Sequence, residues 1–347
     1  MFDPKIFAQG VYGVLQIDWL LRCETPLALR NGLTLAYTES KRGKERGQGL
    51  NLLWREKRNN NEHEVSALHY GPKVQGDQVR FIHFVPGSSV RGALRNWIAR
   101  HLVQKEMVAA LKPPPQKEET DEEETETFLE VLDKALDTGY KSIELVFSLF
   151  GQTADSRTEG ERRLEANAGR LRVDVQPFAG ANLRGIDSSG SSMTVQEGPD
   201  NAARHMTVRS PIDRITHAAK ESGLHHFLEF SKGETFRVRL SISNPTPQDL
   251  GMISLWRREM NDGLLRFGAL SSVGRGRVSV QEEAYDLWLG PQARVFADAE
   301  GLQAVDDDED DALAGLWQHY TLSGEKLSSF EKSLEKFLTG GHDGAQS

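Results

Sequence analysis

The sequence of 347 residues contains one cysteine, Cys23. A single cysteine cannot form a disulfide framework, and it excludes a zinc site built from several cysteines of one chain. The sequence also lacks an apolar run of about 18 residues, which is the length that a membrane-spanning helix needs. No charged N-terminal segment precedes an apolar stretch, so we expect no secretory signal. These absences predict a cytoplasmic protein with no membrane partner.

Recognisable catalytic and metal-binding motifs are missing as well. His63 and His69 resemble the histidine pair of a zinc-protease helix, but that motif needs two histidines four residues apart, and these are six apart. The segment 87–92 has neither the spacing of a nucleophile elbow nor the lysine that ends a phosphate loop. We therefore expect no catalytic residue, no metal and no cofactor.

The charge of the chain is concentrated in two tracts. The formal net charge is −9, from 42 basic and 51 acidic residues. Segments 118–126 and 306–311 hold seven and six acidic residues, so the rest of the chain has 38 acidic and 42 basic residues. Runs of like charge usually lie in solvated loops or tails. The body of the protein is thus mildly basic, which is compatible with an RNA partner.

The pattern of apolar residues predicts alternating strands and helices. Ser88 and Ser89 are expected to cap a helix over 90–108, in which Leu94, Trp97 and Leu102 have helical spacing. A second helix is expected over 250–265. Strands are expected at 11–29, 79–85, 169–175, 235–242 and 278–280. This order predicts an α+β protein with a modified ferredoxin-like core.

Long segments between these elements predict insertions into the core. We expect residues 1–285 to form the core and residues 286–347 to form an acidic and helical C-terminal extension. The expected insertions are a basic one at about 40–80, an acidic and helical one at 108–165, and a protruding hairpin at 205–230. Connections of this length often carry function.

Three stretches favour contact with phosphate groups. In 84–95, serines at a helix start and two arginines four residues apart suit an anion, although an ordinary N-cap with solvated arginines explains the pattern at least as well. In 268–278, glycines permit close backbone approach and arginines can bind phosphate oxygens, although a simple turn is the alternative. The third, 207–230, is a hairpin. Candidate RNA-binding residues are Ser88, Ser89, Arg91, Arg95, Arg209, Arg214, His217, Gly274, Arg275, Gly276 and Arg277.

Together these stretches resemble the RAMP superfamily of CRISPR proteins, and in particular its backbone subunit. The family's Pro-Gly-Ser-Ser-type motif matches 85–92, and its Phe-Gly pair and glycine-led strand match 149–151 and 169–174. Its Ile-Asp-Arg hairpin motif matches 212–214, and its closing glycine-rich loop matches 268–278. The matches follow the family's order over residues 10 to 285.

The resemblance implies an RRM-type core with a thumb hairpin that oligomerises along the spacer part of a guide RNA. The expected partners are guide RNA, target DNA or RNA that pairs with it, other copies of the chain and other effector subunits. Type III backbone subunits cut target RNA with an aspartate after the first strand, whereas 27–39 contains none. This difference favours a type IV subunit without target cleavage.

Two other functions stay open at this stage. One is a type III backbone ribonuclease that cuts target RNA with a divalent metal and with Asp18 or Glu39. The other is an α+β interaction protein whose acidic tracts bind a basic partner and which has no nucleic-acid ligand.

Overall fold

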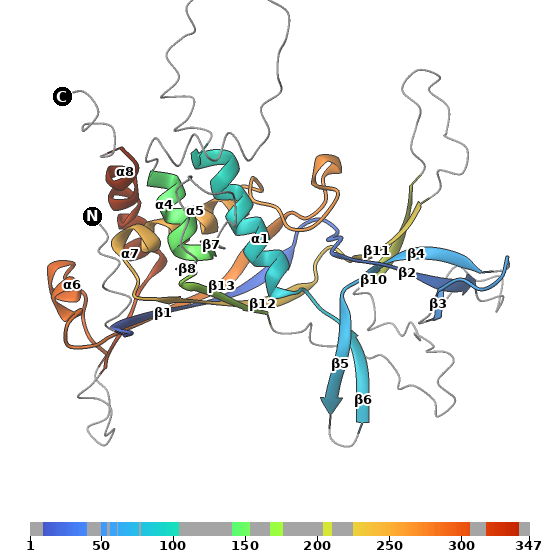
Figure 1. The fold of residues 1–347 in the computed structure, drawn as a ribbon, viewed down its shortest axis with the longest axis horizontal. Coiled ribbons are helices and arrows are strands. Elements are labelled where there is room, and N and C mark those ends of the chain that lie inside the picture. Colours follow the sequence, from blue (N-terminus) through green and yellow to red (C-terminus); the bar gives the residue numbers. More distant parts are fainter. Residues whose placement is uncertain are drawn as a thin grey trace, which may run out of the picture.

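The structure, a computed structural model, consists of two five-stranded sheets with helices packed on one of them (Figure 1). It describes residues 10–39, 50–53, 56–60, 62–75, 78–103, 141–152, 167–175, 204–209, 225–305 and 317–339. Among the helices in these ranges, none is both long and apolar enough to cross a membrane.

The larger sheet forms the core. Its strands are β1 (Gly13–Cys23), β9 (Leu171–Val175), β12 (Thr235–Ser243), β13 (Val278–Leu289) and β14 (Gln318–Thr321). Their order is β14-β13-β1-β12-β9, and each neighbouring pair is antiparallel. Helix α1 lies between β1 and β9 in the sequence, and α5 lies between β12 and β13. This βαββαβ arrangement, with β14 added at one edge, confirms the predicted ferredoxin-like core.

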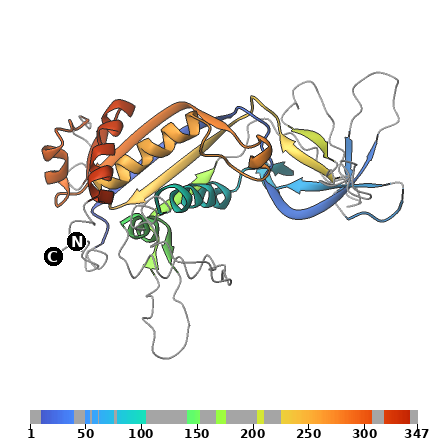
Figure 2. The same cartoon turned by 90° about the horizontal axis from the view of Figure 1, so that it is seen from above.

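All the core helices cover one face of this sheet (Figures 1 and 2). They are α1 (Gly87–Ile98), α4 (Lys141–Phe150), α5 (Pro247–Asn261), α7 (Gly324–Ser329) and α8 (Glu331–Thr339). Along β1, residues 15, 17, 19 and 21 are fully buried, whereas those between them are partly exposed. This period of two is typical of a sheet with one covered face.

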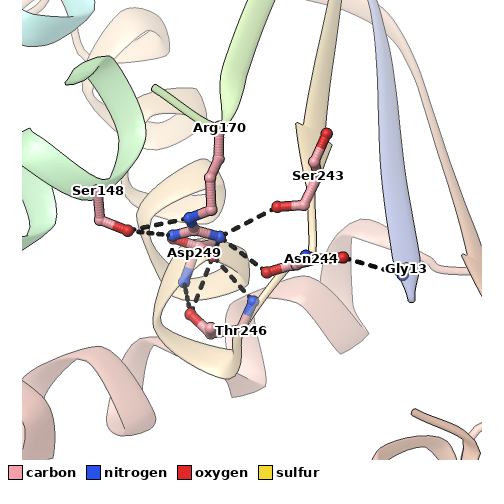
Figure 3. A network of polar contacts seen from close by, with 7 residues as sticks. All are labelled: Gly13, Ser148, Arg170, Ser243, Asn244, Thr246 and Asp249. Carbon is pink, nitrogen blue, oxygen red and sulfur yellow. Dashed lines mark hydrogen bonds and ion pairs between the residues drawn. The ribbon is translucent and has the colours of Figure 1, made fainter. Parts of the chain in front are cut away.

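A buried ion pair joins the start of β9 to α5 and, through a hydrogen bond, to α4 (Figure 3). Arg170 donates to both carboxylate oxygens of Asp249 at 2.7 and 3.0 Å, and the two side chains are 3% and 0% exposed. Arg170 also donates to the hydroxyl of Ser148 in α4 and to the carbonyl of Asn244 after β12. Asp249 completes a capping box with Thr246 at the start of α5. Arg170, which lies in the glycine-led segment 169–174 that matches the family, therefore holds the core together.

The second sheet lies at the opposite end of the molecule from α7 and α8 (Figures 1 and 2). Its strands, in spatial order, are β10 (Arg204–Arg209), β11 (His225–Phe230), β4 (His63–Leu68), β2 (Arg30–Glu39) and β3 (Leu50–Leu53). The antiparallel pair β10–β11 confirms the hairpin predicted at 205–230. Its tip, with Arg214 and His217, lies outside the described residues.

Smaller elements complete the described chain. Strands β5 (Tyr70–Gln75) and β6 (Gln78–His83) form a separate hairpin below α1 in Figure 1. The others are β7 (Gly151–Gln152), β8 (Asn167–Ala168), α6 (Arg294–Ala299), the π-helical turn η2 (Ala99–Val103) and the 3₁₀ turn η3 (Ser271–Val273).

Several sequence-based boundaries differ from the structure. Helix α1 begins at Gly87 after the N-cap Pro86, and no side chain caps it, so the expectation that Ser88 and Ser89 are caps was wrong. The last core strand was predicted at 278–280 but extends to Leu289, and the expected domain boundary at 285 falls inside it. Because β14 pairs with β13, part of the C-terminal extension belongs to the core sheet. Both acidic tracts lie outside the described residues.

Candidate nucleic-acid interface

A cleft of about 730 Å³ separates helix α1 from the loop that follows α5. This volume lies within the range of about 300–1,000 Å³ that is typical of ligand sites. The helix side of the lining is Ser89, Gly92, Ala93, Asn96, Trp97, Arg100 and His101. The loop side is Leu264, Leu265, Arg266, Gly268, Ser271 and Ser272. The fold thus brings two of the three predicted stretches together, although they are far apart in the sequence.

The helix wall of the cleft follows from the spacing of α1. Gly92 and Asn96 are four residues apart, so they lie along one side of α1, and Arg100 follows in the π-helical turn η2. The opposite side is buried through Val90 and Leu94. A Cβ at Gly92 would meet nothing within 4 Å, so the helix backbone is open to the cleft there. This wall can therefore approach a ligand closely.

The loop wall is held by left-handed backbone and by hydrogen bonds to the segment 26–28. Gly268, Gly274 and Gly276 have φ angles of +75°, +86° and +78°. A Cβ at Gly268 would lie 2.4 Å from the carbonyl oxygen of Ala28, and one at Gly276 would lie 1.9 Å from that of Phe267. These two glycines are therefore required for close packing of the loop, in addition to their φ angles.

The charge of the cleft is positive. Within the described part of the chain, its lining includes Arg100 and Arg266, both exposed, and no acidic residue. Arg266 donates to the backbone carbonyls of Gly263 and Ser271, each at 3.0 Å. Among the described residues, no carboxylate is recorded within ion-pair distance of Arg100 or Arg266, so their charge is available to an anion.

An aromatic pair lies at the far end of the helix wall. The rings of Trp97 and His101 are stacked, with centroids 4.9 Å apart and planes 13° apart. His101 also contacts the carbonyl oxygen of Trp97 through Nδ1 at 3.0 Å. Trp97 is buried, whereas His101 is exposed. An exposed ring fixed in this way can stack with a nucleobase, a contact that is common to single-strand binders.

Of the four residues predicted on α1 to bind RNA, one lines the cleft and three do not. Ser89 lines the cleft, whereas Ser88 and Arg95 are exposed outside its lining. Arg91 donates to the carbonyl oxygen of Phe150, and its guanidinium lies 5.6 Å from the centre of that ring. Arg91 therefore connects α1 to the end of α4, and RNA contact by these residues stays a prediction.

The predicted residues of the loop lie outside the cleft lining. Arg275 donates from Nε to Glu229 in β11 at 3.0 Å. Arg277 is exposed, and its backbone carbonyl accepts from the amides of Glu24 and Thr25. Gly274 and Gly276 shape the loop, and Arg209 ends β10 opposite His225. RNA contact by these residues stays a prediction as well.

Sequence reasoning missed most of the residues that do line the cleft. They include Asn96, Arg100, His101, Arg266, Ser271 and Ser272. A signal was present on the helix, because Asn96 and Arg100 repeat the four-residue spacing from Gly92. No such signal connects the helix to Arg266, since the two walls meet only in the folded chain.

Asp18 and Glu39, the two carboxylates considered for catalysis, are not part of the described cleft lining. Asp18 in β1 accepts from Arg237 at 2.6 Å and from Arg239 at 3.2 Å, both in β12. Glu39 is the last residue of β2. No cluster of three or more metal-ligating side chains occurs in the described ranges.

The fold and the cleft define a class: a ferredoxin-like protein with a second sheet built from insertions and a basic cleft suited to a polyanion. A sequence profile of the RAMP superfamily matches residues 21–279, which is most of the chain, and the chain belongs to this superfamily. A solved structure titled "Type IV-B CRISPR Complex" contains a similar chain, at 14% identity and a TM-score of 0.39, covering 78% of this chain and 90% of that one. No curated protein matches.

Proposed function

We propose that this chain is the guide-RNA-binding backbone subunit of a class 1 CRISPR effector complex. Several copies assemble along the spacer part of the guide and present it for pairing with a target. Other effector subunits of the complex are further partners. Membership of the RAMP superfamily and the order of the family motifs support this role.

The observation that carries the proposal is the cleft between α1 and the loop after α5. As far as its lining is described, it combines two arginines without a carboxylate, serine hydroxyls, exposed helix backbone and a fixed imidazole ring. Such a lining suits the sugar–phosphate backbone of a single strand, with sequence-tolerant stacking of bases. A guide-binding subunit needs this tolerance, because the spacer sequence differs from one guide to the next.

We propose that the subunit does not cleave its target. The segment 27–39, where a type III subunit would carry its aspartate, contains no aspartate. Asp18 lies beside two arginines of the neighbouring strand, which suits a structural role. This combination favours a type IV subunit over a type III ribonuclease.

The proposal is tested by purifying the full chain with its co-expressed effector subunits and sequencing the RNA that accompanies it. We expect guide RNA, and we expect affinity for single-stranded RNA to fall steeply with salt, because bound phosphates release counterions. Weak binding without salt dependence would instead favour a protein partner of the acidic tracts. Regularly spaced, magnesium-dependent cuts in a paired target would show that the subunit is a ribonuclease.

A further inference from the structure

A buried carboxylate lies at the base of the hairpin formed by β10 and β11. The side chain of Glu229 in β11 is 0% exposed. Its Oε1 accepts from Nε of Arg275 at 3.0 Å, and its Oε2 accepts from the hydroxyl of Thr207 in β10. A buried charge is costly unless it is paired and hydrogen bonded. Arg275 therefore compensates the charge that the two hairpin strands enclose.

Arg275 belongs to the same loop that lines the cleft. The loop contributes Gly268, Ser271 and Ser272 to the cleft and then turns back through Gly274 and Gly276. Because both glycines that flank Arg275 are left-handed, the backbone fixes the direction in which its side chain leaves the loop. The side chain of Arg275 is 22% exposed, and it ends at the hairpin rather than in the cleft lining.

A short segment connects the same two regions through the backbone. Leu27 and Phe230 of β11 exchange hydrogen bonds of 3.1 and 2.9 Å between their amides and carbonyls. The next residue, Ala28, accepts from the amide of Ala269, and Pro26 accepts from the amide of Gly276. Segment 26–28 thus lies between the hairpin base and the loop. The Arg275 side chain connects the loop directly to the hairpin base.

We propose that Arg275 is a positioning residue that couples occupancy of the cleft to the order of hairpin β10–β11. The part that concerns RNA rests on the proposed function. A strand bound in the cleft restricts the loop, the restricted loop holds Arg275 against Glu229, and the hairpin base becomes more ordered. By linkage, a fixed hairpin must strengthen binding in the cleft by the same factor. In this proposal Arg275 acts through Glu229, so the RNA contact predicted for it from the sequence is not required.

The test is hydrogen exchange of the β10 and β11 amides in the full chain, with and without saturating oligouridylate. In the wild type we expect the RNA to slow exchange about tenfold, within the usual range of coupling between sites. In the Arg275→Ala variant the RNA should still bind with an unchanged salt dependence, but the slowing should be lost.

A second variant separates positioning from stability. Arg275→Ala removes a charged partner from the buried carboxylate of Glu229, so it lowers the melting temperature. Arg275→Ala with Glu229→Gln removes that charge and should regain most of the melting temperature, without regaining the RNA-dependent slowing. Slowing of wild-type size in this double variant would overturn the proposal, because a merely structural role predicts its return. Absence of slowing in a wild type that binds the RNA would overturn it too.

A third variant tests the coupling without RNA. Gly274→Ala strains the loop backbone at a φ angle of +86°, and its Cβ meets nothing within 4 Å. In the free protein it should speed exchange of the β10 and β11 amides at least threefold, but not in the Arg275→Ala, Glu229→Gln background. Faster exchange confined to the loop amides would contradict the coupling. If the wild type binds no RNA, the proposed function fails. The exchange measurement on Gly274→Ala then tests by itself whether the loop is coupled to the hairpin.

Discussion

The glycines of the cleft loop allow a matched test of how the loop is built. Gly276 and Gly274 have nearly the same left-handed backbone, but only Gly276 is closely packed, since its Cβ would lie 1.9 Å from the carbonyl oxygen of Phe267. A left-handed alanine costs about 1–2 kcal/mol. We expect Gly274→Ala to lower the free energy of unfolding by this amount alone.

Gly276→Ala should cost more, because the methyl group must separate two paired backbone segments. The change breaks the hydrogen bond from Phe267 to Gly276 and the one from Gly276 to Pro26. At about 1 kcal/mol for each hydrogen bond, the total becomes about 3–4 kcal/mol. The backbone strain is common to both variants. The difference of about 2 kcal/mol between their losses in free energy of unfolding therefore measures the close packing of Gly276 against Phe267.

Urea unfolding followed by tryptophan fluorescence measures both variants under identical conditions, with the midpoint and the slope determined separately. The prediction is a larger loss of stability for Gly276→Ala, with RNA affinity reduced because the displaced loop carries one wall of the cleft. Equal losses for the two variants would refute the close packing of the loop. A loss of stability in Gly276→Ala without any loss of RNA affinity would separate the loop from the binding site.

Three further predictions follow from burial and packing. Gly92→Ala should raise the free energy of unfolding by about 0.5–1 kcal/mol in urea unfolding, because an open helical glycine gains from a methyl group. Asp249→Ala should lower it by about 3–5 kcal/mol, since it leaves Arg170 charged and buried, whereas the exposed control Glu144→Ala should change it by less than about 0.5 kcal/mol. Burial raises the pKa of Cys23 to about 12, so a thiol reagent at about pH 8 should label it only after unfolding, because the thiolate is the reactive form. Rapid labelling of the folded protein would contradict this.

The regular parts of the core could be predicted from local patterns. Alternation of apolar residues gave β12, and helical spacing gave α5, because each pattern is complete within one element. The length of β13 was missed although Tyr285, Leu287 and Leu289 alternate, because the polar residues 281–283 interrupt the apolar pattern after Val280. The start of α1 was missed because serine near a helix start favours a cap, whereas here Pro86 occupies that position.

The site was predicted less well, because side-chain pairing across the fold has no local signature. Arg275 resembled a phosphate ligand in the sequence, yet its partner Glu229 lies 46 residues earlier in another sheet. Arg91 resembled an exposed cation, yet it contacts a carbonyl 59 residues away. The glycine-rich loop and the helix were both recognised as unusual. Which of their residues face each other depends on how the β1–β12–β13 sheet places them.

The most direct test of the account is the salt dependence of single-stranded RNA binding when both cleft arginines are removed. For Arg100→Ala with Arg266→Ala, the negative slope of log affinity against log salt should become shallower by about 1.4, since each phosphate contact to a single strand contributes about 0.7. The matched control is Arg239→Ala with Arg258→Ala, which removes the same charge from arginines paired with Asp18 and Glu331. The control should keep the wild-type slope. An unchanged slope in the cleft variant, or an equal decrease in both variants, would contradict RNA binding in this cleft.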